Sequence, residues 1–139
     1  MRYVLDSGIA ADFIARRGLV PGRVRAARER GDRVGLCTPI LAELVGGVLH
    51  SNNPEQNLAV LRQRIAPLIL WSFDKAAAYE YGRIYSELRA RGRIIQVPDI
   101  QIAAIALTLG NCVVVSKDGD LSAVPGLTVE DWSRDSGAT

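Results

Sequence analysis

The stretch CVVVSKDGD (residues 112–120) passes from a short β-branched run into a polar loop that carries two acidic residues. A valine-rich run of this length is typical of a buried strand. Similar short apolar runs lie at residues 2–5, 34–37, 68–72 and 94–97. We therefore predict strands at these positions.

Helical patterns separate the predicted strands. The clearest covers residues 74–91, where Asp74 is placed to cap the start and Gly92 to stop the end. A Thr38-Pro39 pair predicts the cap and first turn of a helix that ends near Leu49. Further helices are predicted at residues 54–65 and 99–109, and the second is apolar almost all round, as in a buried helix.

Strands that alternate with helices predict a mostly parallel sheet covered on both faces. We find no internal repeat, linker or low-complexity stretch before the polar residues at the end of the chain. The sequence therefore predicts a single α/β domain over residues 1–133, followed by a polar tail at residues 134–139.

Four acidic residues interrupt or border the apolar runs. Asp6 and Asp118 follow two of the predicted strands, Asp99 opens a helix, and Glu43 is the only charged residue in its helix. Ligands of open parallel sheets bind beyond the carboxyl ends of the strands, so these side chains are expected to converge. Because neighbouring carboxylates raise one another's pKa, such a cluster usually holds a cation. We predict a hydrolytic Mg²⁺ or Mn²⁺ site.

Two of the four acidic residues also have a simpler explanation. Asp99 is placed to cap a helix or to interact with its dipole, and Glu43 is compatible with an exposed helix face. The glycines at positions 46 and 47 leave open space beside Glu43. Ser7 is predicted to cap a helix and to place a hydroxyl near Asp6, while Ser116 is predicted to orient a water or a carboxylate.

Composition places the chain among ordinary globular proteins. Of its 139 residues, 48% are apolar and 23% are charged, which is enough to bury one core. No apolar run approaches the roughly 20 residues that span a bilayer, so we expect a cytoplasmic protein that does not contact membranes. Cys37 and Cys112 have no metal-ligand spacing and are predicted to be buried free thiols.

The net charge is only +2, but the chain has 15 arginines and 2 lysines. Two explanations of the arginines near the N-terminus stay open: contact with phosphates, or a solvated helix face in an arginine-rich composition. The crowded positions are Arg16, Arg17, Arg23, Arg25, Arg28, Arg30 and Arg33.

Several other chemistries lack their motifs. The only histidine, His50, has no nucleophile motif around it and is predicted to lie at a helix end or on the surface. The sequence has no GxSxG elbow, no P-loop and no GxGxxG fingerprint. Acyl transfer, triphosphate use and dinucleotide binding are therefore disfavoured.

Four short motifs occur in an order that is similar to a known family: YVLDS at residues 3–7, TPILAEL at 38–44, PDIQIAA at 98–104 and VVSKDGDL at 114–121. With them, and with the closing VPGL (124–127) and EDW (130–132), the chain resembles the PIN-domain ribonucleases of the VapC toxin type. The resemblance covers nearly the whole chain.

The resemblance implies a three-layer α/β/α fold, a homodimer, and a small VapB-like antitoxin that binds across the active-site groove. It implies that Asp6, Glu43, Asp99 and Asp118 form the acidic metal site, with Asp6 and Asp99 as its most dependable ligands and Asp120 as a further acid. Ser7 and Ser116 stand where the family often has threonine, so each position keeps its hydroxyl.

These expectations combine into one functional hypothesis. The chain is expected to be a toxin that hydrolyses RNA, in loops of tRNA or rRNA, with Mg²⁺ or Mn²⁺. RNA contacts are expected from Arg83 and Arg93, or from the arginines of residues 16–33. The alternatives are a non-catalytic PIN-fold module that binds RNA or protein, and a phosphoesterase or nuclease with a non-RNA substrate.

Overall fold

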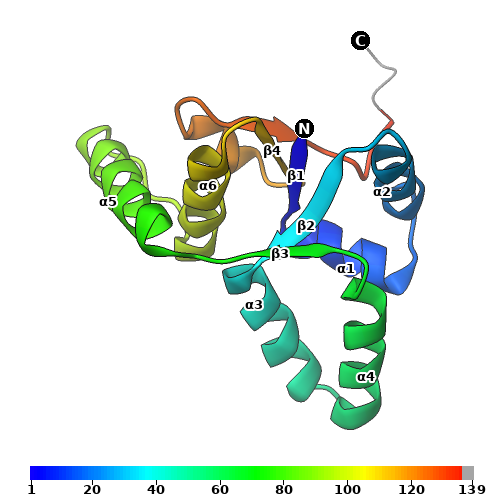
Figure 1. Cartoon of the computed structure of the whole chain (residues 1–139). Helices are drawn as coiled ribbons and strands as arrows, with labels where there is room; N and C mark the ends of the chain where they lie inside the picture. Colours follow the sequence, from blue (N-terminus) through cyan, green and yellow to red (C-terminus); the bar gives the residue numbers. More distant parts are fainter. Residues whose placement is uncertain (136–139) are drawn as a thin grey trace.

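A five-stranded parallel sheet forms the centre of the molecule, whose computed structural model describes residues 1–135 (Figure 1). The strand order is β3-β2-β1-β4-β5, and every neighbouring pair is parallel. The strands are β1 (Arg2–Leu5), β2 (Arg33–Cys37), β3 (Ile69–Trp71), β4 (Cys112–Val115) and β5 (Thr128–Glu130). Because all strands run the same way, their carboxyl ends lie at one edge of the sheet.

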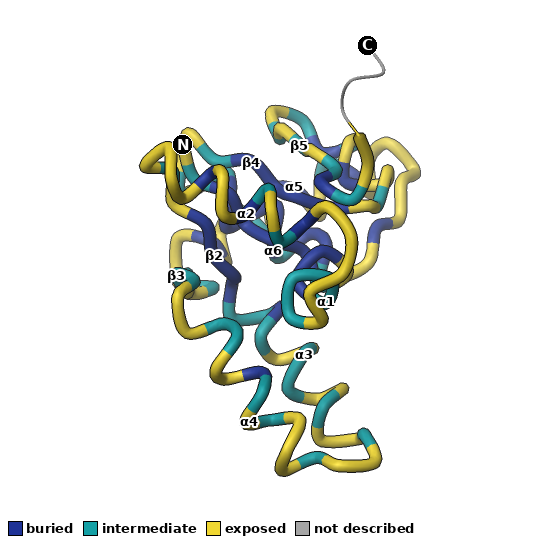
Figure 2. Tube along the Cα trace, turned by 90° about the vertical axis from the view of Figure 1, so that its right-hand side faces the viewer, coloured by how far each residue is buried: buried dark blue, intermediate teal, exposed yellow. Residues whose placement is uncertain are grey.

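Helices cover both faces of the sheet, which confirms the predicted three-layer α/β/α fold (Figure 1). One layer contains α1 (Ser7–Ala15) and α2 (Val20–Glu29), and the other contains α5 (Lys75–Ala90) and α6 (Val97–Leu109). The hairpin of α3 (Thr38–Leu49) and α4 (Pro54–Ile65) extends from the carboxyl edge, and most of its far end is exposed (Figure 2). A short 3-10 helix, Gly119–Ala123, follows β4.

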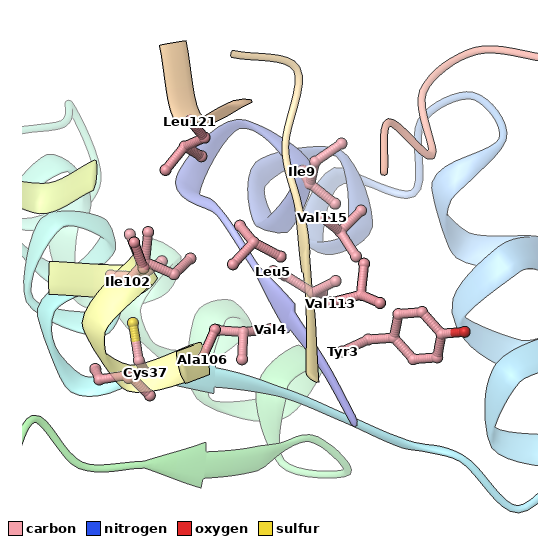
Figure 3. Close-up of a cluster of buried hydrophobic side chains, with 14 of the residues drawn as sticks. Tyr3, Val4, Leu5, Ile9, Cys37, Ile102, Ala106, Val113, Val115 and Leu121 are labelled. Carbon is pink, nitrogen blue, oxygen red and sulfur yellow. The ribbon is translucent and has the colours of Figure 1, made fainter. Parts of the chain in front are cut away.

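The core lies between β1, β4 and the two helical layers (Figure 3). Val4 and Leu5 of β1 are completely buried, and so is Ile102 of α6. Burial of each such side chain contributes about 1.5–3 kcal/mol. The all-round apolar character of α6 therefore has the predicted cause, since this helix packs against β4, α5 and α3.

The ends of α5 follow the sequence prediction, whereas the start of α3 does not. The Asp74 carboxylate accepts a hydrogen bond from the amide of Ala77 at 2.9 Å, and Gly92 has a φ of +70° just beyond the end of α5. Thr38, however, is the first residue of α3 and not its cap, because Cys37 holds the cap position. The Thr38 hydroxyl instead accepts a hydrogen bond from the amide of Phe73 at 3.0 Å, which fixes the end of β3 to the start of α3.

The predicted strand at residues 94–97 is wrong. These residues belong to the loop before α6, and Val97 already lies in the helix. Ile94 is 92% exposed, whereas Ile95 is buried, so the loop inserts one side chain into the core. Pro98 explains the start of α6, because proline fits the first helical turn and cannot donate to a sheet.

The fifth strand is instead β5, at the edge beside β4. It has only three residues, which is too short for a recognisable alternation.

The remaining sequence predictions concern the thiols, the membrane and the tail. Both cysteines are free, as predicted; Cys37 is buried, but Cys112 is only half-buried, which corrects the prediction that both are buried. Burial raises the pKa of Cys37 to about 12. No helix within residues 1–135 is long and apolar enough to span a bilayer. The predicted tail boundary stays a prediction, because residues 136–139 lie outside the described part of the chain.

Candidate active site

The four predicted acids meet in one cleft at the carboxyl edge of the sheet. This cleft has a volume of about 390 Å³. Asp6 enters it directly after β1, Asp99 from the first turn of α6, Glu43 from α3, and Asp118 from the loop after β4. Its lining residues are Asp6, Ser7, Gly8, Glu43, Gln96, Pro98, Asp99, Ser116, Lys117 and Asp118.

Asp6 is the most constrained of the four acids. It is 9% exposed, and both of its carboxylate oxygens accept hydrogen bonds at 2.8 Å, Oδ1 from the Ser7 amide and Oδ2 from the Ser116 hydroxyl. Asp6, and not Ser7, therefore caps α1, which corrects the prediction for Ser7. Asp6 is the cap because its backbone is extended, not helical, and its side chain accepts a hydrogen bond from the first amide of the helix.

Ser116 connects two of the acids. Its hydroxyl donates to Asp6 and accepts a hydrogen bond from the Asp118 amide at 2.9 Å. Ser116 is only 2% exposed, so this orientation is enforced by burial as well as by hydrogen bonds. The Asp118 carboxylate in turn accepts the amide of Asp120 at 2.9 Å, and Asp120 itself does not line the cleft. The arrangement fixes the direction of the loop after β4.

Asp99 has a raised pKa because of its surroundings in the cleft. Burial, together with the carboxyls of Asp118, Asp6 and Asp120, raises the pKa of Asp99 to about 7. The alternative explanation that Asp99 caps α6 is wrong, because Gln96 holds the cap position and no side chain makes a capping hydrogen bond there. Asp99 lies in the first turn, where the helix dipole favours the charged form. Burial and carboxylate repulsion outweigh that effect.

Glu43 differs from the other three because it is exposed and belongs to two surfaces. It lines the acidic cleft and also an adjoining apolar groove of about 380 Å³ between α1, α3 and α4. No atom lies within 4 Å of a Cβ built on Gly46 or Gly47, which confirms the open space predicted beside Glu43. The groove contains Ile14, Leu44, Val48, Val60 and Leu61 among its lining residues.

One positive charge lies at the rim of the cleft. The Lys117 ammonium pairs with Asp12 at 2.8 Å, and Asp12 also pairs with Arg17 at 3.2 Å. The hydrogen bond from Lys117 is the main reason that the pKa of Asp12 is lowered. Lys117 therefore balances local charge, and Asp12 is an ion-paired residue of α1.

The chemistry of the donors fits a hard divalent cation, since carboxylate oxygens are what Mg²⁺ and Mn²⁺ prefer. Within residues 1–135, however, no three acidic, histidine or cysteine side chains surround one point closely enough for a preformed metal site. Mg²⁺ commonly keeps several waters and takes only one or two carboxylates from the protein. Burial and the neighbouring carboxyls raise the pKa of Asp99. A bound cation would lower this pKa again, because it favours the charged form of the carboxyl.

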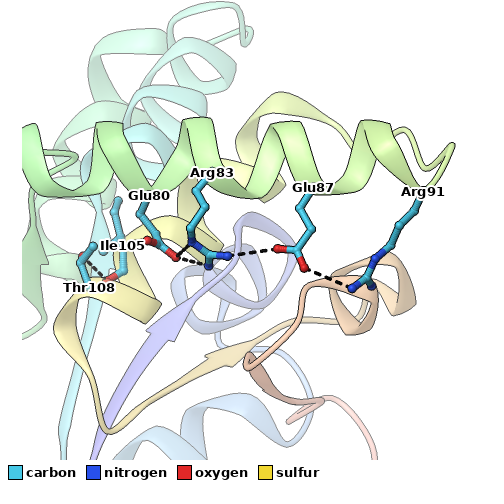
Figure 4. A network of polar contacts seen from close by, with 6 residues as sticks. All are labelled: Glu80, Arg83, Glu87, Arg91, Ile105 and Thr108. Carbon is cyan, nitrogen blue, oxygen red and sulfur yellow. Dashed lines mark hydrogen bonds and ion pairs between the residues drawn. The ribbon is translucent and has the colours of Figure 1, made fainter.

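The two arginines predicted to bind RNA do not line the acidic cleft. Arg83 is paired with Glu80 and Glu87 on α5, and Glu87 also pairs with Arg91 at 3.1 Å (Figure 4). Arg93 is exposed in the loop before α6. Sequence reasoning also missed Gln96, which lines the cleft; its place two residues before Pro98-Asp99 was the available signal.

The sequence model of the PIN domain family matches residues 3–127 of this chain. The chain therefore belongs to the PIN domain family.

Within this family the chain is similar to VapC ribonucleases over nearly its whole length. It is 31% identical over 133 residues to the tRNA(fMet)-specific endonuclease VapC of Shigella flexneri, a match that covers 96% of this chain and 99% of the relative. It is 29% identical over 132 residues to ribonuclease VapC2 of Haemophilus influenzae, with 95% and 98% covered.

Two solved structures share the fold. The crystal structure of VapBC2 from Rickettsia felis, bound to a DNA fragment from its promoter, matches with a TM-score of 0.88 and 26% identity over 95% of this chain and 99% of the other. The DNA-bound VapBC of Salmonella typhimurium matches with a TM-score of 0.87 and 29% identity, with 95% and 98% covered. The resemblance inferred from the four motifs is confirmed.

Proposed function

We propose that this chain is the toxin of a toxin–antitoxin pair, an endoribonuclease that hydrolyses RNA phosphodiester bonds in the acidic cleft. The convergence of Asp6, Glu43, Asp99 and Asp118 in one cleft carries the proposal. The relatives named as ribonucleases and as a tRNA-specific endonuclease support RNA, in exposed tRNA or rRNA loops, as the substrate. Such a substrate places the protein in the cytoplasm.

The cofactor in this proposal is Mg²⁺ or Mn²⁺, held by Asp6, Asp99 and Asp118, directly or through water. A bound divalent cation supplies charge that neutralises the phosphodiester and makes water more acidic. Glu43 is exposed at the mouth of the cleft, where it completes the acidic set or orients the attacking water. Its accessibility suits a group that exchanges protons with solvent.

Ser116 and Ser7 act through Asp6 in this proposal. The Ser116 hydroxyl and the Ser7 amide bind opposite oxygens of the Asp6 carboxylate, which leaves the remaining lone pairs facing the cleft. Asp120 acts at a greater distance, because its amide binds Asp118 and its charge contributes to the raised pKa of Asp99. These three residues position the acids and do not contact substrate.

A VapB-like antitoxin is the proposed protein partner, since the solved neighbours are described as VapBC complexes. The apolar groove supports this assignment because it shares Glu43 with the acidic cleft. An antitoxin segment seated there lies beside the catalytic carboxylates. A Val48→Asp substitution in the groove is expected to weaken co-purification of the two proteins, and unchanged co-purification would contradict the placement.

A homodimer is proposed from the family alone. Apolar residues of α4 and the segment after it offer it little support, because Leu61 is 2% exposed and Leu58, Ile65 and Leu68 are half-buried within one protomer. Light scattering coupled to size-exclusion chromatography tests the prediction, and a monomer at micromolar concentration would contradict it.

The direct test is cleavage of total cellular RNA by the purified protein with Mg²⁺ or Mn²⁺, with the cut ends mapped by sequencing. Asp99→Asn and EDTA are expected to abolish discrete cuts. Asp135→Asn is the matched control, because it makes the same chemical change at a side chain that is 96% exposed and does not line the cleft. Full activity of Asp99→Asn, or cation-independent cuts, would refute the assignment.

A parallel assay of DNA and small phosphoesters tests the substrate class. Cleavage of these and not of RNA would favour a different phosphoesterase. No cleavage of any substrate by an antitoxin-free, cation-loaded protein would favour a binding module.

A further inference from the structure

A second cleft is separate from the acidic one and is lined by arginines. It has a volume of about 930 Å³ and is lined by residues of α1, α2 and α4 and of the segments next to them. Four arginines line it: Arg16, Arg25, Arg28 and Arg64. Glu29 is the only acidic residue among its lining residues. The cleft therefore has an excess of positive charge in a protein whose net charge is only +2.

None of these four arginines has a carboxylate partner in the described chain, and three of them also lack the backbone bond that Arg64 makes. Neighbouring arginines of the same region do form ion pairs, Arg17 with Asp12 and Arg30 with Asp32. Across residues 1–135, no ion pair involves Arg16, Arg25 or Arg28. Their guanidinium groups are thus available to an anionic ligand.

The fourth arginine builds the wall of the cleft. Arg64, near the end of α4, donates from Nη1 to the carbonyl oxygen of Ile14 at 2.6 Å. This bond fixes α4 against the last turn of α1. Arg25 and Arg28 are three residues apart on α2, a spacing that puts both side chains on one face of the helix. The arginines of the cleft are therefore held by α1, α2 and α4, of which α1 and α4 are joined by the Arg64 hydrogen bond.

Helix α1 connects this cleft to the acidic one. Asp6 caps its first turn, and Arg16 occupies its C-terminal cap. A helix of nine residues is about 14 Å long at 1.5 Å per residue. That distance corresponds to about four nucleotides of a stacked strand at 3.4 Å each. An RNA strand cut in the acidic cleft is long enough to reach the arginines.

We infer that the arginine cleft is a second binding site for the RNA substrate, which holds backbone phosphates several nucleotides away from the cleaved bond. The inference rests on the proposed function, because it takes RNA as the substrate. Planar guanidinium groups bind phosphate oxygens in pairs, and such contacts do not depend on base sequence. The cleft thus contributes affinity and orientation, while the acidic cleft performs the chemistry.

An acidic protein segment is the competing occupant. The apolar groove beside Glu43 already offers the buried surface that a protein partner needs, whereas the arginines of the second cleft are mostly exposed. Exposed ion pairs with carboxylates contribute little, about 0–1 kcal/mol each. Phosphates of a continuous strand gain in addition from the release of condensed counterions. RNA is therefore the better fit.

The test measures binding without cleavage. Every protein carries Asp99→Asn and is titrated in EDTA against a fluorescent 30-nucleotide single-stranded RNA, by anisotropy at several salt concentrations. Arg25→Ala/Arg28→Ala is compared with Arg33→Ala/Arg62→Ala, which removes the same charge from exposed arginines that do not line the cleft. Circular dichroism melts check that all variants fold.

We expect Arg25→Ala/Arg28→Ala to weaken RNA binding about tenfold at 150 mM salt and to lower the salt slope by about 1.4, the value for two phosphate contacts to a single strand. The control is expected to change affinity less than about twofold. An Arg25→Lys/Arg28→Lys variant is expected to recover most of the salt slope because it retains both charges.

Two results would overturn the inference. One is equal RNA affinity of the two double alanine variants, and the other is a loss that appears only for poly-glutamate and not for RNA, which would assign the cleft to an acidic protein segment. Because binding is read without cation or cleavage, a failed cleavage assay and a failed binding assay are independent outcomes.

Discussion

Replacing Asp99 with asparagine is expected to stabilise the protein at alkaline pH and to leave its stability unchanged in mild acid. The pKa of Asp99 is raised from 3.8 to about 7 in the folded protein. The folded state therefore keeps a proton that the unfolded state releases, so the free energy of unfolding falls as pH rises from about 4 to about 7. Asparagine has nearly the same shape and does not titrate.

The magnitude follows from the size of the shift. A difference of about three pKa units corresponds to about 4 kcal/mol at most. Water at the mouth of the cleft screens the carboxylates, so we expect Asp99→Asn to exceed the parent protein by about 1–2 kcal/mol at pH 8. At pH 4 the two proteins are expected to differ by less than about 0.5 kcal/mol.

The assay is urea unfolding followed by circular dichroism from pH 4 to pH 8, with Asp135→Asn as the control. Titrating groups outside the cleft contribute equally to both proteins, so the difference curve reports Asp99 together with the carboxyls coupled to it. Mn²⁺ at a hundred times its dissociation constant is expected to stabilise the parent protein at pH 8 by about 2.7 kcal/mol. Parallel pH profiles of the parent and Asp99→Asn, or equal stabilisation of both by Mn²⁺, would refute the reasoning.

Substitutions at four further positions test the packing and hydrogen bonding of the domain. Gly35→Ala is expected to destabilise by about 2–3 kcal/mol in urea unfolding, because its Cβ would lie 2.3 Å from the Ile69 carbonyl oxygen; Gly82→Ala, with nothing within 4 Å, should stabilise by about 0.5–1 kcal/mol. Ser116→Ala leaves a buried Asp6 oxygen unpaired and is expected to cost about 1–3 kcal/mol and slow RNA cleavage, whereas Ser116→Thr should retain most cleavage. Ile102→Ala empties a completely buried position and is expected to cost about 2–5 kcal/mol in the same unfolding assay.

The sequence predicted most of the fold because its signals were local. Strands β1 and β4 are short valine- and leucine-rich runs, and helix α5 has a capping aspartate and a terminal glycine that the structure confirms. The error at residues 94–97 arose because isoleucine pairs favour a strand while Pro98 favours the first turn of a helix, and the helix prevailed. Strand β5 is defined by its pairing with β4, which no local pattern reveals.

The sequence predicted which acidic residues form the site, but not which hydrogen bonds and caps they make. A parallel sheet brings the residues after its strands to one edge, so the convergence of Asp6 and Asp118 follows from topology. The helix α1 begins one residue earlier than a Ser7 cap requires, and sequence alone does not fix a helix boundary to one residue. Asp6 therefore caps α1 in place of Ser7. The arginine cleft depends on how α4 packs against α1, a tertiary contact with no sequence signature. Periodicity predicts elements, but packing decides which surfaces they share.

The hydrogen bond between Ser116 and Asp6 joins residues 110 positions apart, and this separation has a consequence for synthesis. Translation proceeds at about 5–20 residues per second, so Asp6 leaves the ribosome roughly 5–20 seconds before Asp118, the last of the four acids in the cleft. A nascent chain that carries Asp6 and Glu43 still lacks β4, the central neighbour of β1, and with it the loop that completes the cleft. If the proposed function holds, the nascent chain therefore lacks a complete acidic cleft until β4 and the loop after it have been made.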